Sequence, residues 1–279
     1  MRRAVRYIQG LGFSKESKGY PTLMDSLKQE GIIDKRVFAF HLDSGMSPTN
    51  PPSVLSFGSW DLEKYALSPP IYLPIVSESG RWGVRLNGFK VNETLIPESS
   101  VALIHSWGVS ITIPYNAHSI YSSTICKIVS CTSSVYVVNF KCPNNEEKRL
   151  PNITFLLGSH EFSLPYYLYI RKHDGKCESI VRLDLTDYYT IGIPLMFAYY
   201  TIFDMENEQI GFARSVNSFY SPSLPPIERD FTLYWIGGAL ALLSLLSCVA
   251  VCYIYFRRIK KEEASNYEPF IPTKLDWVG

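Results

Sequence analysis

A long uncharged stretch near the carboxyl terminus limits the ways in which this chain can fold. Residues 231–256 read FTLYWIGGALALLSLLSCVAVCYIYF, without a single Asp, Glu, Lys or Arg. About 20 apolar residues cross the ~30 Å hydrocarbon core of a bilayer as a helix. The basic segment RRIKK follows at once, and Lys and Arg are enriched on the cytoplasmic side. The sequence therefore predicts one transmembrane helix over residues 231–256, with residues 257–279 in the cytoplasm.

Two further features predict that residues 1–230 are lumenal or extracellular. Asn92-Glu93-Thr94 and Asn152-Ile153-Thr154 are acceptor sequences for N-glycosylation. Four cysteines precede the membrane stretch, an even set of the kind found in oxidising compartments: Cys126, Cys131, Cys142 and Cys177. Four cysteines allow three pairings, and the sequence alone does not choose among them. We expect a single-pass type I membrane protein of the secretory or endosomal system or of the cell surface.

The amino terminus conflicts with this placement. The first residues read MRRAVRYIQGLGFSKESKGY, which contains no apolar core of the kind that a signal peptide requires. Because the glycosylation sequences, the cysteines and the basic segment all agree, we expect the natural protein to begin upstream with a signal peptide.

Composition excludes several classes of function. The 279 residues are 46% hydrophobic, enough for a substantial core, and the net charge is +1. No basic cluster occurs before Arg257, so nucleic acid is not an expected partner. There is no Gly-rich phosphate-binding loop, and His41, His118, His160 and His173 have no metal-ligand spacing. We therefore expect neither a cofactor nor a metal.

Residues 1–230 have the pattern of an all-β domain, in which short β-branched and aromatic runs alternate with Pro, Gly, Ser and Asn. Helices are predicted at Thr22–Gly31 and His118–Ile128, and a Pro- and Ser-rich stalk at 218–230. The predicted strands are Val37–Leu42, Ser53–Gly58, Trp82–Leu86, Ile111–Pro114, Val135–Phe140, Ile153–Leu157, Tyr167–Ile170 and Tyr199–Phe203.

Five segments, in order, resemble the pepsin-like (A1-type) aspartic peptidases: IQGLGFS, LMDSLKQEGIIDKRVFAFHLD, VLSFGSWDLEKYA, LPNITFLLGSHEFSLPYYLYI and TIGIPLMFAYYTIFDMENEQIGFARS. With its carboxyl-terminal anchor, the layout is similar to that of beta-secretase-like members. The resemblance implies a mainly β, pepsin-like fold followed by one transmembrane helix. The domains that it implies are the truncated end of the N-terminal lobe (1–45), the C-terminal lobe (46–217), the stalk (218–230), the transmembrane helix (231–256) and the cytoplasmic tail (257–279).

The resemblance also implies where catalysis would occur. Pepsin-like enzymes use two Asp carboxylates, each in a D-[ST]-G-[ST] turn, to share a proton and to hold the attacking water. The second turn corresponds to Val101–Pro114, VALIHSWGVSITIP, which contains no Asp or Glu. Counting back from Pro114 puts His105 at the Asp position, whereas matching GVS to the Gly-Thr-Ser of the family puts Ser106 there. Both alternatives stay open, and neither residue is acidic.

Three functions follow as expectations. The chain begins after the first catalytic turn and after the flap that would cover a substrate, so as written it is expected to be an inactive member of the aspartic endopeptidase family. The alternatives are a pseudopeptidase that binds a peptide or a partner protein in the remnant cleft, and a truncated gene model of an active enzyme. A new nucleophile made of His105 and Ser106 is disfavoured, because adjacent residues of an extended segment point to opposite faces.

The resemblance implies two details of the structure. It pairs Cys142 with Cys177, which leaves Cys126 and Cys131 to each other. It also places Val101–Ile104 beside Thr190–Gly192, beneath the altered turn, although the Asp usual after this glycine is replaced by Ile193.

Two last expectations concern the membrane and the tail. Gly237 and Ala241 have the small-xxx-small spacing that lets two membrane helices approach, so a weak homodimer is expected through them. Tyr267-Glu268-Pro269-Phe270 fits the tyrosine-plus-apolar pattern of an endosomal sorting signal.

Overall fold

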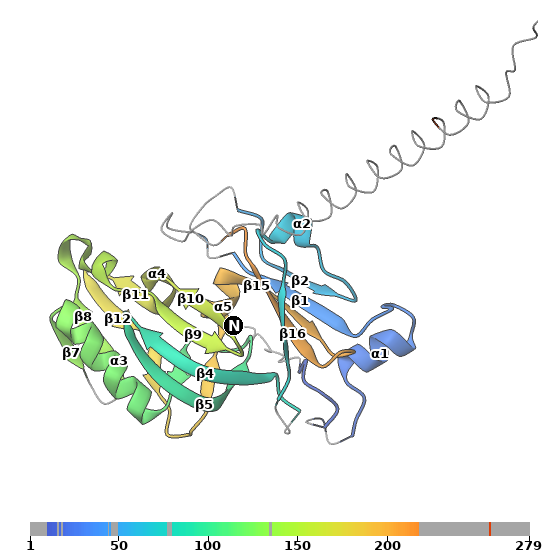
Figure 1. Ribbon diagram of the computed structural model, residues 1–279, viewed down its shortest axis with the longest axis horizontal. Helices are drawn as coiled ribbons and strands as arrows, with labels where there is room; N and C mark the ends of the chain where they lie inside the picture. Colours follow the sequence, from blue (N-terminus) through green and yellow to red (C-terminus); the bar gives the residue numbers. More distant parts are fainter. Residues whose placement is uncertain are drawn as a thin grey trace, which may run out of the picture. The chain divides into compact units, whose positions relative to one another are not determined.

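The computed structural model describes residues 10–217, apart from 16, 18, 44, 46–49, 77–79 and 134–135, together with residue 257. The chain divides into two compact units, Met1–Phe219 and Tyr220–Gly279. Every helix and strand below belongs to the first unit (Figure 1). The predicted stalk, transmembrane helix and sorting signal lie outside the described residues. In the part of the chain that is described, no helix is long and apolar enough to cross a membrane.

The described unit is mainly β, and its first sheet joins segments from both ends of the unit. Its five strands are all antiparallel, in the order β2-β1-β15-β16-β3. They are β1 (Val37–His41), β2 (Val54–Phe57), β3 (Ile71–Pro74), β15 (Tyr199–Asp204) and β16 (Gln209–Arg214). The domain boundary expected at 45/46 therefore falls between two strands, β1 and β2, that are hydrogen-bonded neighbours.

A second sheet has seven strands, in the order β10-β9-β4-β5-β14-β6-β13. They are β4 (Gly83–Val91), β5 (Thr94–Ile104), β6 (Ile111–Ile113), β9 (Ile153–Leu157), β10 (His160–Leu164), β13 (Val181–Leu183) and β14 (Tyr189–Ile191). A third sheet has the order β11-β12-β8-β7. Its strands are β7 (Cys131–Ser133), β8 (Val138–Lys141), β11 (Ile170–His173) and β12 (Lys176–Ser179).

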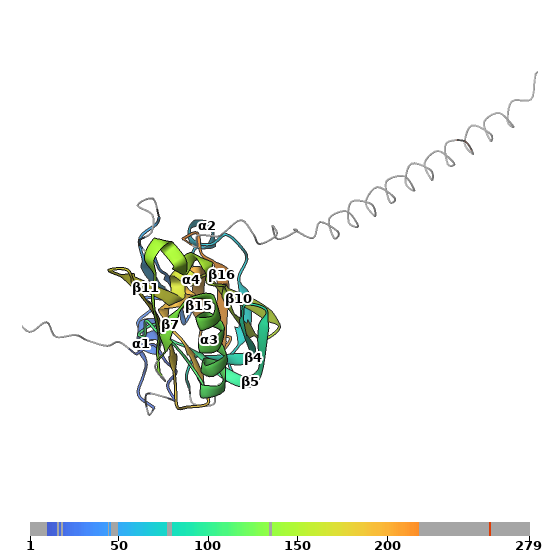
Figure 2. The same cartoon turned by 90° about the vertical axis from the view of Figure 1, so that its left-hand side faces the viewer.

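Helices are short apart from α3 (Tyr115–Ile128), which packs against β4, β7 and β13 (Figure 2). Its buried residues Ala117, Tyr121 and Ile125 are spaced four apart, so they form one face of the helix. The others are α1 (Leu23–Gln29), α2 (Leu62–Tyr65), α4 (Tyr166–Tyr169), α5 (Ile193–Ala198) and the 3-10 helix η1 (Pro143–Arg149).

The structure corrects three predicted elements. Tyr167–Ile170 is not a strand, because a helical turn, α4, covers Tyr166–Tyr169 and β11 begins only at Ile170. The second helix begins at Tyr115 rather than at His118, and β8 begins at Val138. The first predicted helix is confirmed as α1. Thr22 caps it, with reciprocal hydrogen bonds to Asp25.

An aromatic cluster fixes β1 in the interior. Phe38 stacks on Phe203 of β15 with the ring centroids 4.8 Å apart, and Trp82 packs edge-on against both rings. Trp82 also donates a hydrogen bond from Nε1 to the carbonyl of Leu11 at 2.8 Å. The segment before α1 is thereby held to the start of β4.

Candidate functional site

The candidate site is the turn that connects β5 to β6, residues 105–110. β14 lies between these two strands, parallel to β5 and antiparallel to β6, so the turn passes across the end of β14. Thr190 is opposite Leu103, and Ile191 is opposite Ile104. The expected adjacency of Val101–Ile104 and Thr190–Gly192 is confirmed.

His105 fills this turn. Its backbone N–H donates to the carbonyl of Ile191 at 3.2 Å, which continues the β5–β14 ladder by one residue. Its ring turns back along the loop, where Nδ1 accepts a hydrogen bond from the backbone N–H of Gly108 at 3.2 Å. The ring is half-buried, and burial lowers the pKa of His105. A neutral imidazole with an unprotonated Nδ1 fits this acceptor role.

Two glycines allow the backbone to close around the ring. A Cβ atom on Gly108 would lie 2.4 Å from Cε1 of His105. A Cβ atom on Gly192 would lie 2.1 Å from the carbonyl oxygen of Gly108. Ile193, the next residue, donates its N–H to that same oxygen at 2.9 Å. The turn and the end of β14 are thus in direct backbone contact, which leaves no room for a side chain at residue 192.

Ser106, Trp107 and Val109 are the exposed residues of the turn. Ser106 is exposed, whereas His105 is the first residue after β5 and is bonded to β14. The side chains of Trp107 and Val109 are 80% and 50% exposed. The turn therefore has a half-buried imidazole and two exposed apolar side chains, of which the Trp107 ring lies 6.2 Å from the His105 ring, centroid to centroid. No carboxylate lies in Val101–Pro114 to pair with a second one.

Two disulfides involve the four-stranded sheet, one joining α3 to β7 and the other joining the residue after β8 to β12. Cys126 is bonded to Cys131 and Cys142 to Cys177, with Cα–Cα distances of 5.2 Å and 5.8 Å. This is the pairing that the resemblance implies.

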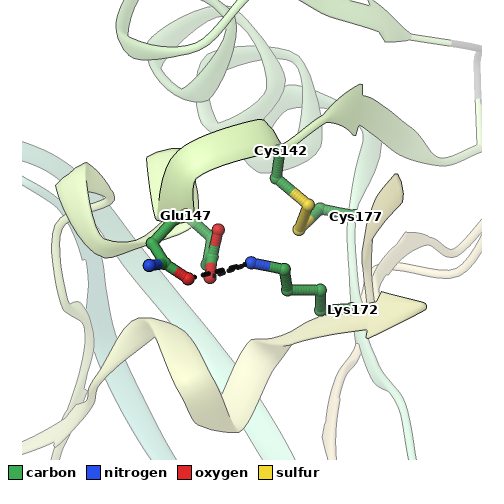
Figure 3. Close-up of a disulfide and its surroundings, with 5 residues drawn as sticks. Cys142, Glu147, Lys172 and Cys177 are labelled. Atoms are coloured by element: carbon green, nitrogen blue, oxygen red, sulfur yellow. Dashed lines mark hydrogen bonds and ion pairs between the residues drawn. A yellow bond between two sulfur atoms is a disulfide. The ribbon is translucent and has the colours of Figure 1, made fainter. Parts of the chain in front are cut away.

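The Cys142–Cys177 bond lies beside an ion pair between Lys172 and Glu147, whose atoms are 2.7 Å apart (Figure 3). Burial raises the pKa of Glu147, but the hydrogen bond from Lys172, a backbone hydrogen bond and the charges of Lys172 and Lys148 together outweigh it and lower this pKa below the ordinary value. The contact between Glu147 and Lys172 ties η1 to β11.

The same place holds the one group of potential metal ligands among the described residues, Cys142, Glu147 and Cys177. Both sulfurs are already joined in the disulfide, so neither is a free thiolate for a metal.

Two of the four histidines that lack metal-ligand spacing, His41 and His118, are buried in the structure. His41 is fully buried, stacks on Tyr65 at 4.4 Å, and lies 2.9 Å from the side-chain nitrogen of Asn217. His118 is 4% exposed on the inner face of α3. His41 belongs to β1 and His118 to α3, and each ring lies against a tyrosine ring, Tyr65 and Tyr121 respectively.

A sequence model of the family "Eukaryotic aspartyl protease" matches residues 4–215, which include the whole turn and both of its flanking strands. The chain belongs to this family.

Curated relatives agree with this assignment. The chain is 26% identical over 200 residues to "Aspartic protease Bla g 2" of Blattella germanica, which covers 71% of this chain and 55% of that protein. It is 26% identical over 216 residues to gastricsin of Oryctolagus cuniculus, with 74% and 53% covered, and 28% identical over 218 residues to "Pepsin II-2/3" of the same species, with 75% and 54% covered. The chain spans about half the length of the curated relatives that it matches.

Proposed function

We propose that this chain is a membrane-anchored, non-catalytic member of the aspartyl protease family, which binds a peptide or protein segment at the 105–110 turn without cleaving it. One observation carries the proposal. His105, one of the two residues that the resemblance offers for the Asp position, lies in the turn with Nδ1 bonded to the N–H of Gly108, and the turn contains no carboxylate.

An imidazole does not replace that carboxylate. In a pair of carboxylates, one is protonated and the other is charged because two like charges so close cannot both ionise. The charged member takes a proton from the water and the neutral member hydrogen-bonds the substrate carbonyl. Burial lowers the pKa of His105, and its Nδ1 is already engaged by Gly108. The turn is therefore closed internally and offers no anionic base to a water molecule.

The outer face of the turn suits recognition of an apolar segment. Trp107 and Val109, two residues apart in the turn, each expose at least half of an apolar side chain. Exposed aromatic side chains commonly supply the anchor of a binding surface. A ligand with one bulky apolar side chain, presented in extended form, would bury both.

The catalytic part of this proposal is tested with the purified chain at acid pH. We expect no cleavage of a mixed peptide library and no binding of a pepstatin-like inhibitor, because that inhibitor addresses a carboxylate pair. A pepsin assayed in parallel shows that the conditions support cleavage. Acid-dependent cleavage by this chain that the inhibitor blocks would overturn the proposal.

The binding part is tested by selecting ligands from a displayed peptide library and measuring their affinity for variants. Loss of an aromatic anchor commonly costs about 2 kcal/mol, so Trp107→Ala should weaken binding by more than tenfold. Leu185→Ala is the matched control, since Leu185 is 84% exposed in the β13–β14 loop, away from the turn. Equal weakening by both variants would show that the peptides bind elsewhere or nonspecifically.

The uncharged stretch 231–256 and the following RRIKK segment support the anchoring part. In this arrangement residues 1–230 are lumenal or extracellular and residues 257–279 are cytoplasmic. The full chain should stay in the membrane pellet at alkaline pH, whereas a chain ending at Phe219 should be released. Release of the full chain would contradict an integral anchor.

Two finer proposals concern the anchor and the tail. Tyr267 and Phe270 direct endosomal sorting, so Tyr267→Ala should move the protein toward the cell surface. Gly237 and Ala241 support a weak homodimer, which Gly237→Leu should abolish.

A further inference from the structure

The fold brings the two glycosylation sequences together at one end of the seven-stranded sheet. β4 and β9 are antiparallel neighbours (Figure 1). Val91 is opposite Ile153. Asn92 follows Val91 and Asn152 precedes Ile153, so the two asparagines flank the same pair on the same side. Both are exposed. The two asparagines, which are 60 residues apart in the sequence, are therefore neighbours in the folded protein.

The two acceptor sequences differ in the exposure of the threonine hydroxyl, which lies two residues after the asparagine in each and which the glycosylating enzyme also requires. Asn92 and Glu93 form the two-residue loop of the β4–β5 hairpin, where Asn92 has a left-handed φ of 56°. Thr94, the hydroxyl residue of this site, is exposed. The whole acceptor of the first site, Asn92-Glu93-Thr94, is therefore open on the surface of the folded chain.

The hydroxyl of the second site is closed off. Thr154 lies within β9, between β4 and β10, and only 7% of it is exposed. It is in register with Ser163, and their hydroxyl oxygens are 2.7 Å apart. A glycosylating enzyme that must bind the Thr154 hydroxyl reaches this group only when β9 has separated from β10.

We propose that both asparagines are N-glycosylated at different stages: Asn152 only before β9 enters the sheet, and Asn92 either before or after folding. In each case the side-chain nitrogen Nδ2 attacks C1 of a lipid-linked oligosaccharide. The N–C bond forms, the C–O bond to the lipid diphosphate breaks, the diphosphate leaves with the bonding electrons, and the amide proton passes to a base of the transferase. The proposal rests on the lumenal placement in the proposed function, because the lipid-linked oligosaccharide is available on the lumenal side.

The position of the glycans is compatible with ligand binding at the turn. β5 runs from Thr94, beside Asn92, to Ile104, beside His105. At ~3.3 Å per residue the strand separates the two ends by about 30 Å. The glycans cover one end of the sheet and leave the other end open.

The test uses the full chain, produced without glycans in bacteria, purified oligosaccharyltransferase and a lipid-linked oligosaccharide. Folded chain is compared with chain unfolded by reduction and alkylation, and occupancy is measured by mass spectrometry of glycopeptides. The Asn152 site should react at least about tenfold less in the folded chain, because opening a central strand requires local unfolding. The Asn92 site should change by less than about twofold, because its acceptor needs no opening.

The β11–β12 hairpin provides a matched control. Asp174 and Gly175 form its two-residue loop, Asp174 has a φ of 48°, and both are exposed, as Lys176 is. The double substitution D174N/K176T therefore creates an acceptor with the geometry of the Asn92 site, and it should be modified in the folded chain.

Each result decides the proposal. Equal occupancy of Asn152 in the folded and unfolded chains overturns the staging. If Asn92 is not glycosylated in the folded chain, the claim that this site is accessible after folding is wrong, whether or not the control site reacts. The assay does not depend on topology; wrong lumenal placement would instead appear as absence of all three glycans in cells, with normal modification in vitro.

Discussion

At the scale of single residues, the altered turn depends on His105 and on the glycines that contact it. The absence of a carboxylate from the turn could be predicted from the sequence, but the role of His105 could not, because the contact between its ring and Gly108 exists only in the folded chain. The resemblance offers both His105 and Ser106 for the Asp position. What the β5–β14 register adds is that His105 is the first residue of the turn and is bonded to Ile191 of β14.

The two glycines should respond differently to an added methyl group. Gly108→Ala would place Cβ against the His105 ring, and Gly192→Ala would place it against backbone at Gly108. Overpacking costs about 1–3 kcal/mol, and more where the obstacle cannot move. We expect Gly192→Ala to lower the free energy of unfolding by at least about 3 kcal/mol, and Gly108→Ala by less.

A double-mutant cycle measured by chemical denaturation separates the two causes. The His105→Ala background should remove most of the cost of Gly108→Ala and leave that of Gly192→Ala unchanged. Gly10→Ala is the neutral control, because a Cβ at Gly10 meets nothing within 4 Å. If His105→Ala relieved both glycine variants equally, the backbone contact at Gly192 would not be the obstacle.

At the scale of elements, the errors of sequence reasoning have identifiable causes. The aromatic run at Tyr167–Ile170 has strand propensity, but Pro165 starts a helical turn, and the hydroxyl of Tyr169 reaches the carbonyl of Pro151.

Most of β5 was not predicted, because Pro97 and the polar residues after it are typical of a loop. Pro97 is opposite Gly88, next to an irregularity in the β4–β5 ladder, which is where a strand tolerates proline.

The turn between β15 and β16 holds α1 through a cluster of charges that sequence patterns do not reveal. Glu206 accepts hydrogen bonds from the side chain of Lys28 and from the backbone and side chain of Arg36, and these lower the pKa of Glu206 to about 2. Arg36 also pairs with Asp25 of α1 at 3.0 Å. The cluster therefore joins α1, the segment before β1 and the β15–β16 turn.

This cluster predicts a defined pH dependence. The pKa of Glu206 is depressed from its ordinary value of 4.5 to about 2, so the carboxylate stabilises the fold fully above pH 4.5. Its contribution falls as the pH is lowered and is lost below about pH 2. Glu206→Gln should lower the free energy of unfolding by about 1 kcal/mol at pH 7, given that the side chain is partly exposed, and by nothing measurable at pH 2.

Denaturant titrations from pH 2 to 7 check this difference. Glu208→Gln, in the same turn, is the control that leaves Lys28 and Arg36 paired with Glu206, and it should not reproduce the pH-dependent difference. A constant difference between Glu206→Gln and the unchanged chain at every pH would exclude the ionised carboxylate as the cause.

At the scale of the whole molecule, local patterns predicted the class of fold but not the pairing of distant strands. The resemblance placed β1 in a separate lobe, yet β1 lies between β2 and β15 in one sheet. Strand pairing over such sequence separations is set by which apolar faces meet in the folded state, so composition and periodicity do not encode it directly. Only the adjacency of β5 and β14 could be expected, and that came from the family pattern.

This arrangement predicts that residues 1–45 and 46–217 do not fold independently. A chain of residues 46–219 would lack the strand between β2 and β15 and would leave two unpaired edges, together with the apolar surface that Phe38 covers on Phe203. We expect it to aggregate and to show no cooperative unfolding. In the full chain, Phe38→Ala should cost about 3–5 kcal/mol, as expected for a buried Phe, whereas Leu55→Ala on β2, where the side chain is 39% exposed, should cost less than about 1 kcal/mol. A soluble 46–219 chain that unfolds cooperatively at the same denaturant concentration as the full chain would instead make residue 45 a true domain boundary, and β1 would then be an accessory to the sheet rather than part of its core.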